Sequence, residues 1–333
     1  MAGVKLFPKR ERKQKKTMSY SSGSEKAEQI VKEEMKTKDM SAYEYHVIQC
    51  CKNDEWVLRK WLHKALGRAG FTIYEDGYQT DRIKKDKRYS AVHNMVAIRG
   101  NPRVCLVAHT DVCRDHDSSR YSIMGEYSWM ADREEENIGT KSQLSSQKVE
   151  PVIKVVEHEG QMRRIIQDKD CKLQVGGDDR LGVAIATWIA LNTGYDLGLY
   201  FPTDEEIGLK SAAACEMEQL RRFELCMQID RGNHSHQIVL RISNELMCTY
   251  STAVFLLEKA YDLGLPREPV SGLSTDVYAL HKKGLIKDAV NMTCGYHNSH
   301  GSSASEYIDI QESKDTMRFV SEVVKAYYLG ENP

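Results

Sequence analysis

Residues 104–111 have the sequence VCLVAHTD, in which a short apolar run leads directly into a histidine and an acidic residue. An uninterrupted apolar run of this length is typical of a strand that is buried on both faces, in the middle of a mostly parallel sheet. We therefore expect residues 104–108 to form a central strand. His109 and Asp111 then stand at its carboxyl end, where open α/β sheets bind their ligands.

Apolar strands alternate with helical periodicity over most of the chain. The sequence predicts strands at 71–74, 94–98, 151–156, 197–201, 225–229 and 286–292, and helices at 56–66, 183–191, 209–220, 244–263 and 311–328. A hairpin turn is expected near Gly160. This order predicts an α/β fold, specifically a three-layer sandwich with a mostly parallel central sheet.

The composition is that of a globular protein with a sizeable core. The 333 residues are 41% hydrophobic and 29% charged, with a formal net charge of −1. A charge this close to zero gives no electrostatic reason to expect nucleic acid or a membrane as the main partner. The sequence also shows no apolar stretch long enough to cross a bilayer and no secretory signal.

The cysteines indicate a reducing compartment. Nine are scattered along the chain without a CxxC pair, and several, such as Cys105, stand in apolar runs. Reduced, partly buried thiols fit this pattern better than a disulfide framework or a cysteine-built zinc site. We therefore expect a soluble, cytoplasmic protein.

Two segments lack the pattern of a packed domain. Residues 1–39 are polar with a basic run at 9–16, which predicts a flexible tail; a nuclear address or a polyanion contact is the alternative. Residues 112–150 are polar and almost aperiodic, which predicts a surface insert. The folded domain is thus expected at 40–333, with the insert at about 112–150.

Acidic residues and histidines stand where predicted strands end. In chain order they are His109 with Asp111, Glu205 with Glu206, Asp230, and a loop that holds His297 and His300. A further acidic pair, Asp178 and Asp179, lies where a glycine-rich turn enters a helix. Because the carboxyl ends of parallel strands meet at one edge, we expect these side chains to share one rim.

Imidazole and carboxylate groups are the ligands that zinc accepts, and two ions about 3.5–4 Å apart need a carboxylate that bridges them. Such a set is available in His109, Asp178, Glu206, Asp230 and His300. Each residue alone is ordinary, but their joint placement at strand ends favours a metal site. Two other histidine clusters, around His116 and at 234–236, are interpreted as a solvated loop and as surface.

In order and in surroundings, these motifs resemble those of the peptidase T group of co-catalytic zinc exopeptidases. The matching stretches are 109–111, 176–182, 203–208, 229–230 and 295–301, within a resemblance that covers roughly 43–328. The resemblance implies two zinc ions per chain, with cobalt or manganese as alternatives. It implies that Asp178 bridges the ions, that His109 and Asp230 complete one site, and that Glu206 and His300 complete the other.

The resemblance also implies roles for neighbouring residues. Glu205 would be the general base that takes a proton from the attacking water. Asp111 would hydrogen-bond His109 and fix its tautomer. The peptide bond between Asp178 and Asp179 would be cis.

Two assignments stay open. Residues 274–276 resemble the family's substrate-side turn, but an ordinary helix N-cap fits them equally well. His297 could serve as an oxyanion donor or replace His300 as ligand. We favour His300 because Gly301 and the acidic Glu306 follow it, as in the family pattern.

The chain departs from the family in one region. The family carries a separate lid and dimerisation domain between its fourth and fifth ligands, whereas only about seventy residues separate Asp230 from His300 here. We therefore expect no separate lid domain. The insert at 112–150 could partly close the site. The oligomeric state stays open, and a homo-oligomer is compatible with the sequence.

The sequence thus predicts a di-zinc metallohydrolase, most specifically an aminopeptidase or a small-peptide (tripeptide) hydrolase. Its partner would be a short peptide or another small amide, with no membrane and no nucleic acid. One alternative is an amidohydrolase or deacylase of a non-peptide amide. The other is a catalytically silent, metal-binding assembly protein, which Glu205 beside Glu206 disfavours.

Overall fold

The computed structural model describes residues 32–33, 35–36, 40–84, 86–112, 149–158, 160–171, 173–299 and 306–333. The chain divides into two units, 1–42 and 43–333, and the fold below is that of the second. Most of the predicted tail and insert, together with His116 and His300, lies outside the described residues.

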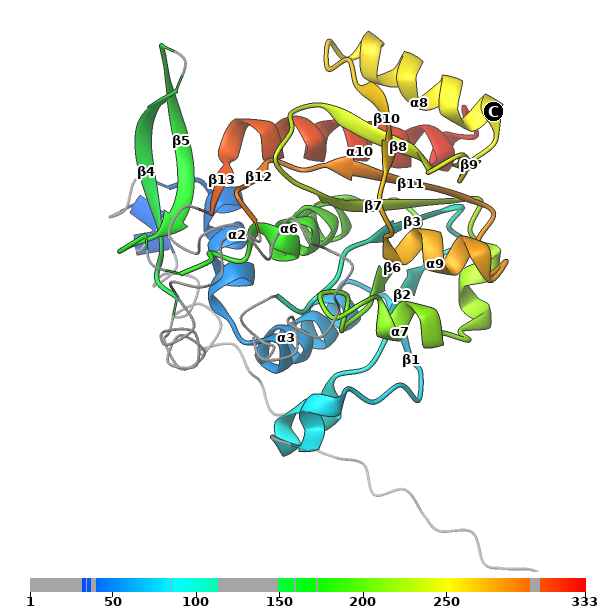
Figure 1. The fold of residues 1–333 in the computed structure, drawn as a ribbon, viewed down its shortest axis with the longest axis horizontal. Coiled ribbons are helices and arrows are strands. Elements are labelled where there is room, and N and C mark those ends of the chain that lie inside the picture. Colours follow the sequence, from blue (N-terminus) through cyan, green and yellow to red (C-terminus); the bar gives the residue numbers. More distant parts are fainter. Residues whose placement is uncertain are drawn as a thin grey trace, which may run out of the picture. The chain divides into compact units, whose positions relative to one another are not determined.

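A nine-stranded sheet forms the centre of this unit (Figure 1), in the order β1-β2-β6-β3-β7-β11-β8-β10 with β9 beside β8. The strands are β1 (Thr72–Glu75), β2 (Met95–Arg99), β3 (Val104–Val107), β6 (Leu197–Phe201), β7 (Leu225–Arg231), β8 (Gln237–Ile242), β9 (Glu245–Leu246), β10 (Glu268–Gly272) and β11 (Asp288–Thr293). The neighbours β6, β3, β7 and β11 run parallel. The predicted α/β fold with a mostly parallel sheet is confirmed, and β3 is central and fully buried.

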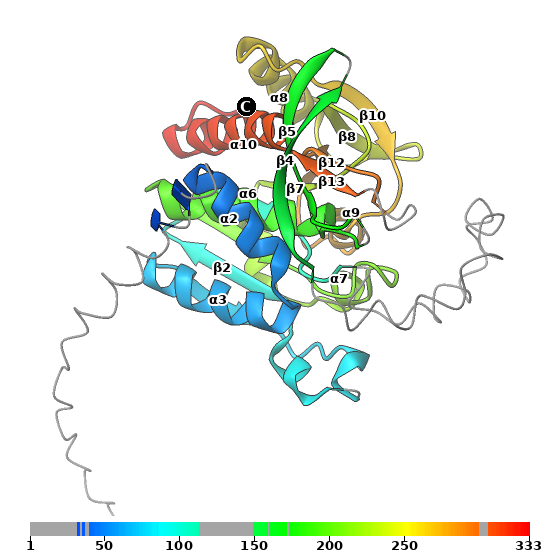
Figure 2. The same ribbon diagram turned by 90° about the vertical axis from the view of Figure 1, so that its left-hand side faces the viewer.

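A second, four-stranded sheet has the order β12-β13-β5-β4. Its strands are β4 (Pro151–His158), β5 (Gln161–Asp168), β12 (Tyr296–His297) and β13 (Tyr307–Asp309). Strands β4 and β5 form the predicted antiparallel hairpin, which turns at Gly160 with φ +77° (Figure 2). Through β12 and β13 this sheet adjoins the loop that follows β11.

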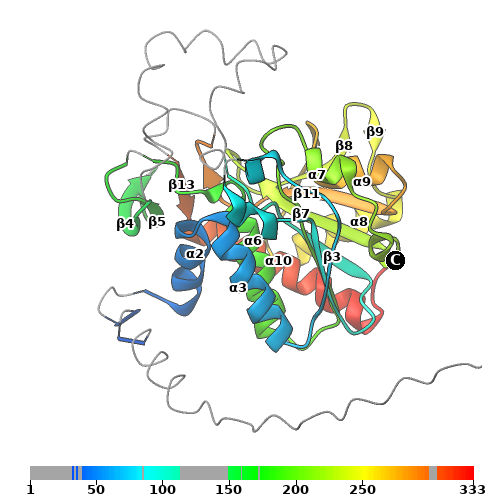
Figure 3. The same cartoon turned by 90° about the horizontal axis from the view of Figure 1, so that it is seen from below.

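Helices cover both faces of the central sheet (Figure 3). One face carries α2 (Ala42–Lys52), α3 (Glu55–Arg68), α6 (Gly177–Asn192) and α10 (Ile310–Leu329), and the other carries α7 (Lys210–Ala214), η5 (Glu218–Arg222) and α9 (Asp276–Lys282). Helix α8 (Tyr250–Asp262) packs on α10, where the Phe255 and Tyr327 rings meet edge to face at 5.8 Å. Two short 3-10 helices, η1 (Asp81–Lys84) and η2 (Lys87–Ala91), lie between β1 and β2 in sequence.

Two predicted helices have different bounds in the structure. The segment 209–220 is not one helix but α7 and η5, joined by extended residues, because Cys215, Met217 and Leu220 all turn into the core beneath the sheet. The helix expected from 244 begins at Tyr250, since Thr249 caps it by accepting the Thr252 N–H. Helix α2 was not predicted.

The segment between Asp230 and His300 contributes to the core. Its strands β8, β10 and β11 belong to the central sheet, and its helix α9 packs against β7 and β11. The absence of a separate lid domain stays a prediction. Among the helices that the structure describes, none is long and apolar enough to cross a membrane.

Candidate metal centre

Five predicted residues meet at the carboxyl end of the sheet, and we call them the rim cluster: His109, Asp178, Glu205, Glu206 and Asp230. His109 follows β3, the glutamates follow β6, Asp230 lies at the last position but one of β7, and Asp178 lies in the first turn of α6. The Nε2 atom of His109 is 3.1 Å from Asp178 Oδ1, 3.7 Å from Asp230 Oδ1 and 3.9 Å from Glu205 Oε2. The structure therefore brings these residues together, as parallel strand ends require.

Two overlapping groups of side chains in this cluster could hold an ion. One is His109 with Asp178 and Glu206, and the other is His109 with Asp179 and Asp230; within each, the ligand atoms lie within 4.8 Å of one another. Nitrogen from imidazole and oxygen from carboxylate suit zinc. Asp179 was not among the predicted ligands, and its carboxylate also accepts the N–H groups of His109 and Gly182.

Burial makes the acidic groups of the cluster resist ionisation. The pKa of Glu205 and that of Glu206 are raised well above their usual range by burial, and although His109 lowers them, neighbouring carboxylates raise them further. The pKa of Asp230 is raised by burial and by Asp178. A divalent cation would offset this repulsion between carboxylates, so the donor set and its charge fit a metal.

The His109 ring is held at Nδ1 by Asp111. Its Nδ1 lies 3.0 Å from the carbonyl oxygen of Asp111 and 3.4 Å from its Oδ1. Because a carbonyl oxygen can only accept, Nδ1 carries the proton, and in the neutral ring Nε2 is left to face the carboxylates. Fixing of the tautomer by Asp111 was predicted, but the shorter contact is made by its carbonyl rather than by its carboxylate.

The Asp111 carboxylate has a second task, which the sequence did not predict. Its Oδ1 accepts the N–H of Glu205 and its Oδ2 accepts the N–H of Glu206, each at 3.2 Å. Asp111 thus joins the loop after β3 to the loop after β6. Both loops carry rim residues.

Two glycines, Gly176 and Gly177, form the turn that leads into α6, and the backbone at Gly177 packs too closely for a side chain. Gly176 is the N-cap, with φ +86°, and a Cβ on Gly177 would lie 2.6 Å from the Cβ of Tyr296. The peptide bond between Asp178 and Asp179 is cis, as the family resemblance implied. Glu306 holds this turn by accepting the N–H of Gly176 at 2.8 Å and that of Asp178 at 3.3 Å.

Of the two histidines that follow β11, the structure describes His297 but not His300. His297 Nε2 is 3.0 Å from Glu312 Oε2, and its ring stacks on Tyr307, so this side chain is engaged with β13 and α10. Neither of the ion-holding groups found among the described residues includes His297. His300 lies outside the described residues, and its role as fifth ligand stays a prediction.

At residues 274–276 the structure confirms a helix N-cap, since the Thr275 hydroxyl accepts the Tyr278 N–H. The next residue, Asp276, is nevertheless buried beside the rim cluster, and burial raises its pKa to about 8. Gln228 Nε2 donates both to Asp276 at 3.0 Å and to Asp230 at 2.9 Å. Gln228 was missed, although two-residue periodicity along β7 places it on the same face as Asp230.

Comparison with known proteins identifies the fold. No protein-family model matches the chain, and no curated protein matches it in sequence. Three of the solved structures that do match are a tripeptidase from Staphylococcus aureus subsp. aureus Mu50, aminopeptidase PepT from Bacillus cereus ATCC 10987, and the TET aminopeptidase from Thaumarchaeota archaeon SCGC AB-539-E09.

Their identities to this chain are 13%, 12% and 12%, with TM-scores of 0.62, 0.58 and 0.56 in the same order. Each alignment covers 86% of this chain and 98%, 98% and 97% of the respective neighbour. Similarity of this extent shows that the chain has the fold of these aminopeptidases. At such low identity it establishes the fold alone.

Proposed function

We propose that this protein is a metallohydrolase that cleaves peptide bonds with two zinc ions, as an aminopeptidase or small-peptide hydrolase. The observation that carries the proposal is the convergence of the rim cluster at the ligand-binding edge of an aminopeptidase fold. The tripeptidase and aminopeptidase descriptions of the similar structures support a peptide substrate. Cobalt or manganese are the alternative metals.

The metal would be held by His109, Asp178, Glu206 and Asp230, with His300 as the fifth ligand that the family resemblance implies. When bound, the ions supply a Lewis acid for the scissile carbonyl and make water more acidic. Tyr296 supports one of these donors, because its hydroxyl donates to Asp230 Oδ1 at 3.0 Å.

Glu205 is the proposed general base. Its side chain is 19% exposed, against 0% for His109, 8% for Asp230 and 10% for Asp178, so substrate and water can reach it. Burial raises its pKa, which makes the carboxylate a better proton acceptor and lets it return the proton to the leaving amine. The Asp111 carboxylate fixes its backbone.

The test is hydrolysis of tripeptides by the zinc-reconstituted protein, with N-acetylated tripeptides as the competing substrates. We expect the free peptides to be cleaved from the amino end and the blocked ones to be spared. Cleavage of blocked amides alone would favour the deacylase alternative. Zinc binding without any hydrolysis would favour the silent assembly protein.

Glu205→Gln tests the base. We expect kcat to fall by about 10²- to 10⁴-fold, the usual contribution of a positioned acid or base, while zinc content is unchanged. The matched control is Glu218→Gln, because Glu218 is an exposed glutamate in η5 that pairs with Arg221. Equal activities of the two variants would contradict the assignment.

A further inference from the structure

A second group of buried charges lies against the loops of the rim cluster. It consists of Glu55, Arg59, Arg82 and Asp204, and we call it the arginine cluster. Glu55 contacts Arg82 at 2.6 Å and Arg59 at 3.8 Å, and Arg82 also pairs with Asp204 at 2.8 Å. All four side chains are at least nine-tenths buried. Such charges persist in a protein interior only where they are paired.

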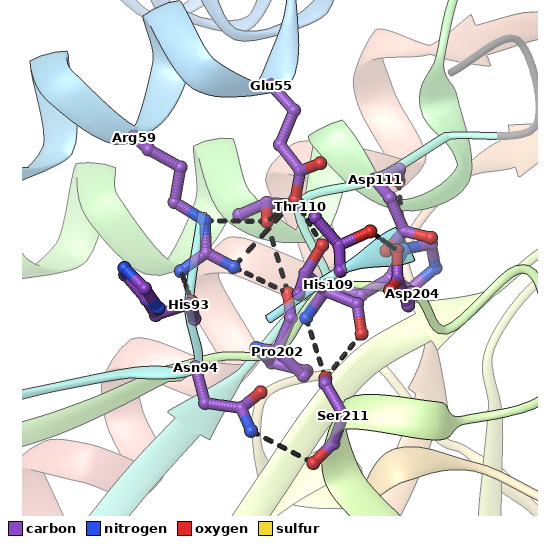
Figure 4. Close-up of polar contacts among 12 residues, drawn as sticks. Glu55, Arg59, His93, Asn94, His109, Thr110, Asp111, Pro202, Asp204 and Ser211 are labelled. Atoms are coloured by element: carbon purple, nitrogen blue, oxygen red, sulfur yellow. Dashed lines mark hydrogen bonds and ion pairs between the residues drawn. The ribbon is translucent and has the colours of Figure 1, made fainter. Parts of the chain in front are cut away.

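One oxygen of Glu55 connects the two loops that carry rim residues. Its Oε1 accepts the hydroxyl of Thr110 at 2.6 Å and the hydroxyl of Thr203 at 2.6 Å. Thr110 stands between His109 and Asp111, and Thr203 stands two residues before Glu205. Figure 4 shows Glu55 reaching from α3 toward Thr110.

Arg59 adds further contacts to the same two loops. Its Nε donates to Thr110 Oγ1 at 2.9 Å, and its Nη2 donates to the carbonyl oxygen of Pro202 at 3.0 Å. Arg59 is one turn after Glu55 in α3, so a single helix face holds both loops. Figure 4 shows Glu55 and Arg59 extending side by side from this helix.

The loop after β6 needs such support because Asp204 adopts an uncommon conformation. Its φ is +53°, in the left-handed region that residues with a Cβ rarely occupy. Its carboxylate accepts the hydroxyl of Tyr78 at 2.7 Å and that of Thr80 at 3.0 Å, in addition to Arg82. Asp204 directly precedes Glu205, so these contacts determine where the proposed base stands.

We infer that Glu55 is a positioning residue of the metal centre, which sets the loop of His109 against the loop of Glu205 and Glu206 through the hydroxyls of Thr110 and Thr203. The inference rests on the proposed function. Glu55 would act through Thr110 and Thr203 rather than as a ligand itself. Burial opposes the ionisation of Glu55, but Arg82, Arg59 and the Thr110 hydroxyl together outweigh that effect and lower its pKa.

Thr110→Val and Thr203→Val test this arrangement one loop at a time. Each removes a hydroxyl at nearly constant volume and leaves the ion pairs of Glu55 with Arg82 in place. For Thr110→Val we expect zinc affinity to fall by about 10- to 100-fold, as for other partners that orient metal ligands. For Thr203→Val we expect kcat to fall by about tenfold or more at unchanged KM. Thr110→Ser and Thr203→Ser, which keep the hydroxyl, should restore both values.

The matched control is Glu44→Gln. Glu44 is a buried helical glutamate of α2 that pairs with Arg164 of β5 at 3.0 Å. The Glu44→Gln variant should have a lower unfolding midpoint, while its zinc affinity and kcat stay within twofold of the wild-type values. A merely structural role for Thr110 and Thr203 would give the same pattern.

Zinc affinity is measured by competition with a chromophoric chelator, so one readout does not depend on hydrolysis. If the wild type binds zinc and the valine variants bind it equally and turn over equally, the positioning role of Glu55 is overturned and the proposed function stands. If the wild type binds no zinc, the proposed function and the positioning role of Glu55 are both contradicted. Loss of affinity or kcat beyond the control, with recovery in the serine variants, supports the inference.

Discussion

The rim cluster and the arginine cluster are both buried and both contain carboxylates, but the positive groups that face these carboxylates differ. In the arginine cluster, Glu55 and Asp204 meet two guanidinium groups. Among the residues that the structure describes, the four carboxylates of the rim cluster share the imidazole of His109. The first is completed by cations of the protein itself, whereas the second is suited to a cation from outside.

The pKa values express the same contrast. Glu55 and Glu206 are both buried glutamates. Burial opposes the ionisation of each, but Arg82 reverses the balance at Glu55 and lowers its pKa, while Asp178 adds to the effect at Glu206 and raises its pKa. The neighbours of a buried acid, rather than its burial, therefore distinguish a structural ion pair from a candidate metal ligand.

Asp178→Ala should have the largest effect, because it removes a donor from the rim cluster. We expect zinc affinity to fall by more than about 100-fold, beyond the range seen for residues that only orient ligands. Hydrolysis should be lost with it. Chelator competition and a peptide assay on the same preparation check both. Unchanged zinc affinity would show that Asp178 is not a zinc ligand.

Arg82→Met should show how strongly the arginine cluster depends on internal pairing. The substitution leaves Glu55 and Asp204 buried without this partner, and removal of one member of a buried ion pair costs roughly 3–5 kcal/mol. Denaturant unfolding of the metal-free protein measures the loss. A change near zero would mean that water or another group replaces the guanidinium, and the contrast between the clusters would weaken.

Glu206→Gln is expected to act in the opposite direction on the metal-free protein. It removes a carboxyl group that the folded metal-free chain keeps protonated while the unfolded chain ionises it, so stability at neutral pH should rise. The rise should exceed about 1 kcal/mol, because a pKa difference of one between the folded and unfolded states already corresponds to about 1.4 kcal/mol. Zinc should then stabilise the variant less than the wild type. If both Arg82→Met and Glu206→Gln destabilise the metal-free chain, the two clusters do not differ as proposed.

The pH dependence sharpens the same contrast. A raised folded-state pKa at Glu206 means that the folded chain keeps a proton that the unfolded chain releases above about pH 4.5, so metal-free stability falls as pH rises above that value. A lowered pKa at Glu55 contributes stability that is present above about pH 4.5 and lost as pH falls. Unfolding measured between pH 4 and 8 should show the decline on the alkaline side without zinc, and zinc should reduce it.

Much of the rim cluster could be predicted because its residues follow apolar strands. His109 and Glu206 come after strands that the sequence marks clearly, Asp230 lies near the end of another, and parallel strands end at one edge. The cis peptide between Asp178 and Asp179 and the expected bridging role of Asp178, which stays a prediction, came from the family resemblance instead. His297 shows the limit of such reasoning, since position in a loop does not decide which way a ring points.

The arginine cluster could not be predicted in the same way. Glu55 reads as an ordinary acidic residue in the first turn of a helix, and Arg59 as its exposed i+4 partner. Arg82 and the Asp204 partners Tyr78 and Thr80 belong to 76–94, a stretch without strong periodicity. Their joint burial depends on how this stretch packs, which no local pattern specifies. The roles of Thr110 and Thr203 likewise depend on both loops packing against α3, where their hydroxyls reach Glu55.

The central claim is that the rim cluster is a metal site, and the most direct test is elemental analysis of the purified wild-type chain after reconstitution with zinc and removal of free ions. The account predicts near two zinc ions per chain, the number that a co-catalytic site holds. A chain that retains no zinc would contradict it, because the acidic groups around His109 would then be buried for another reason.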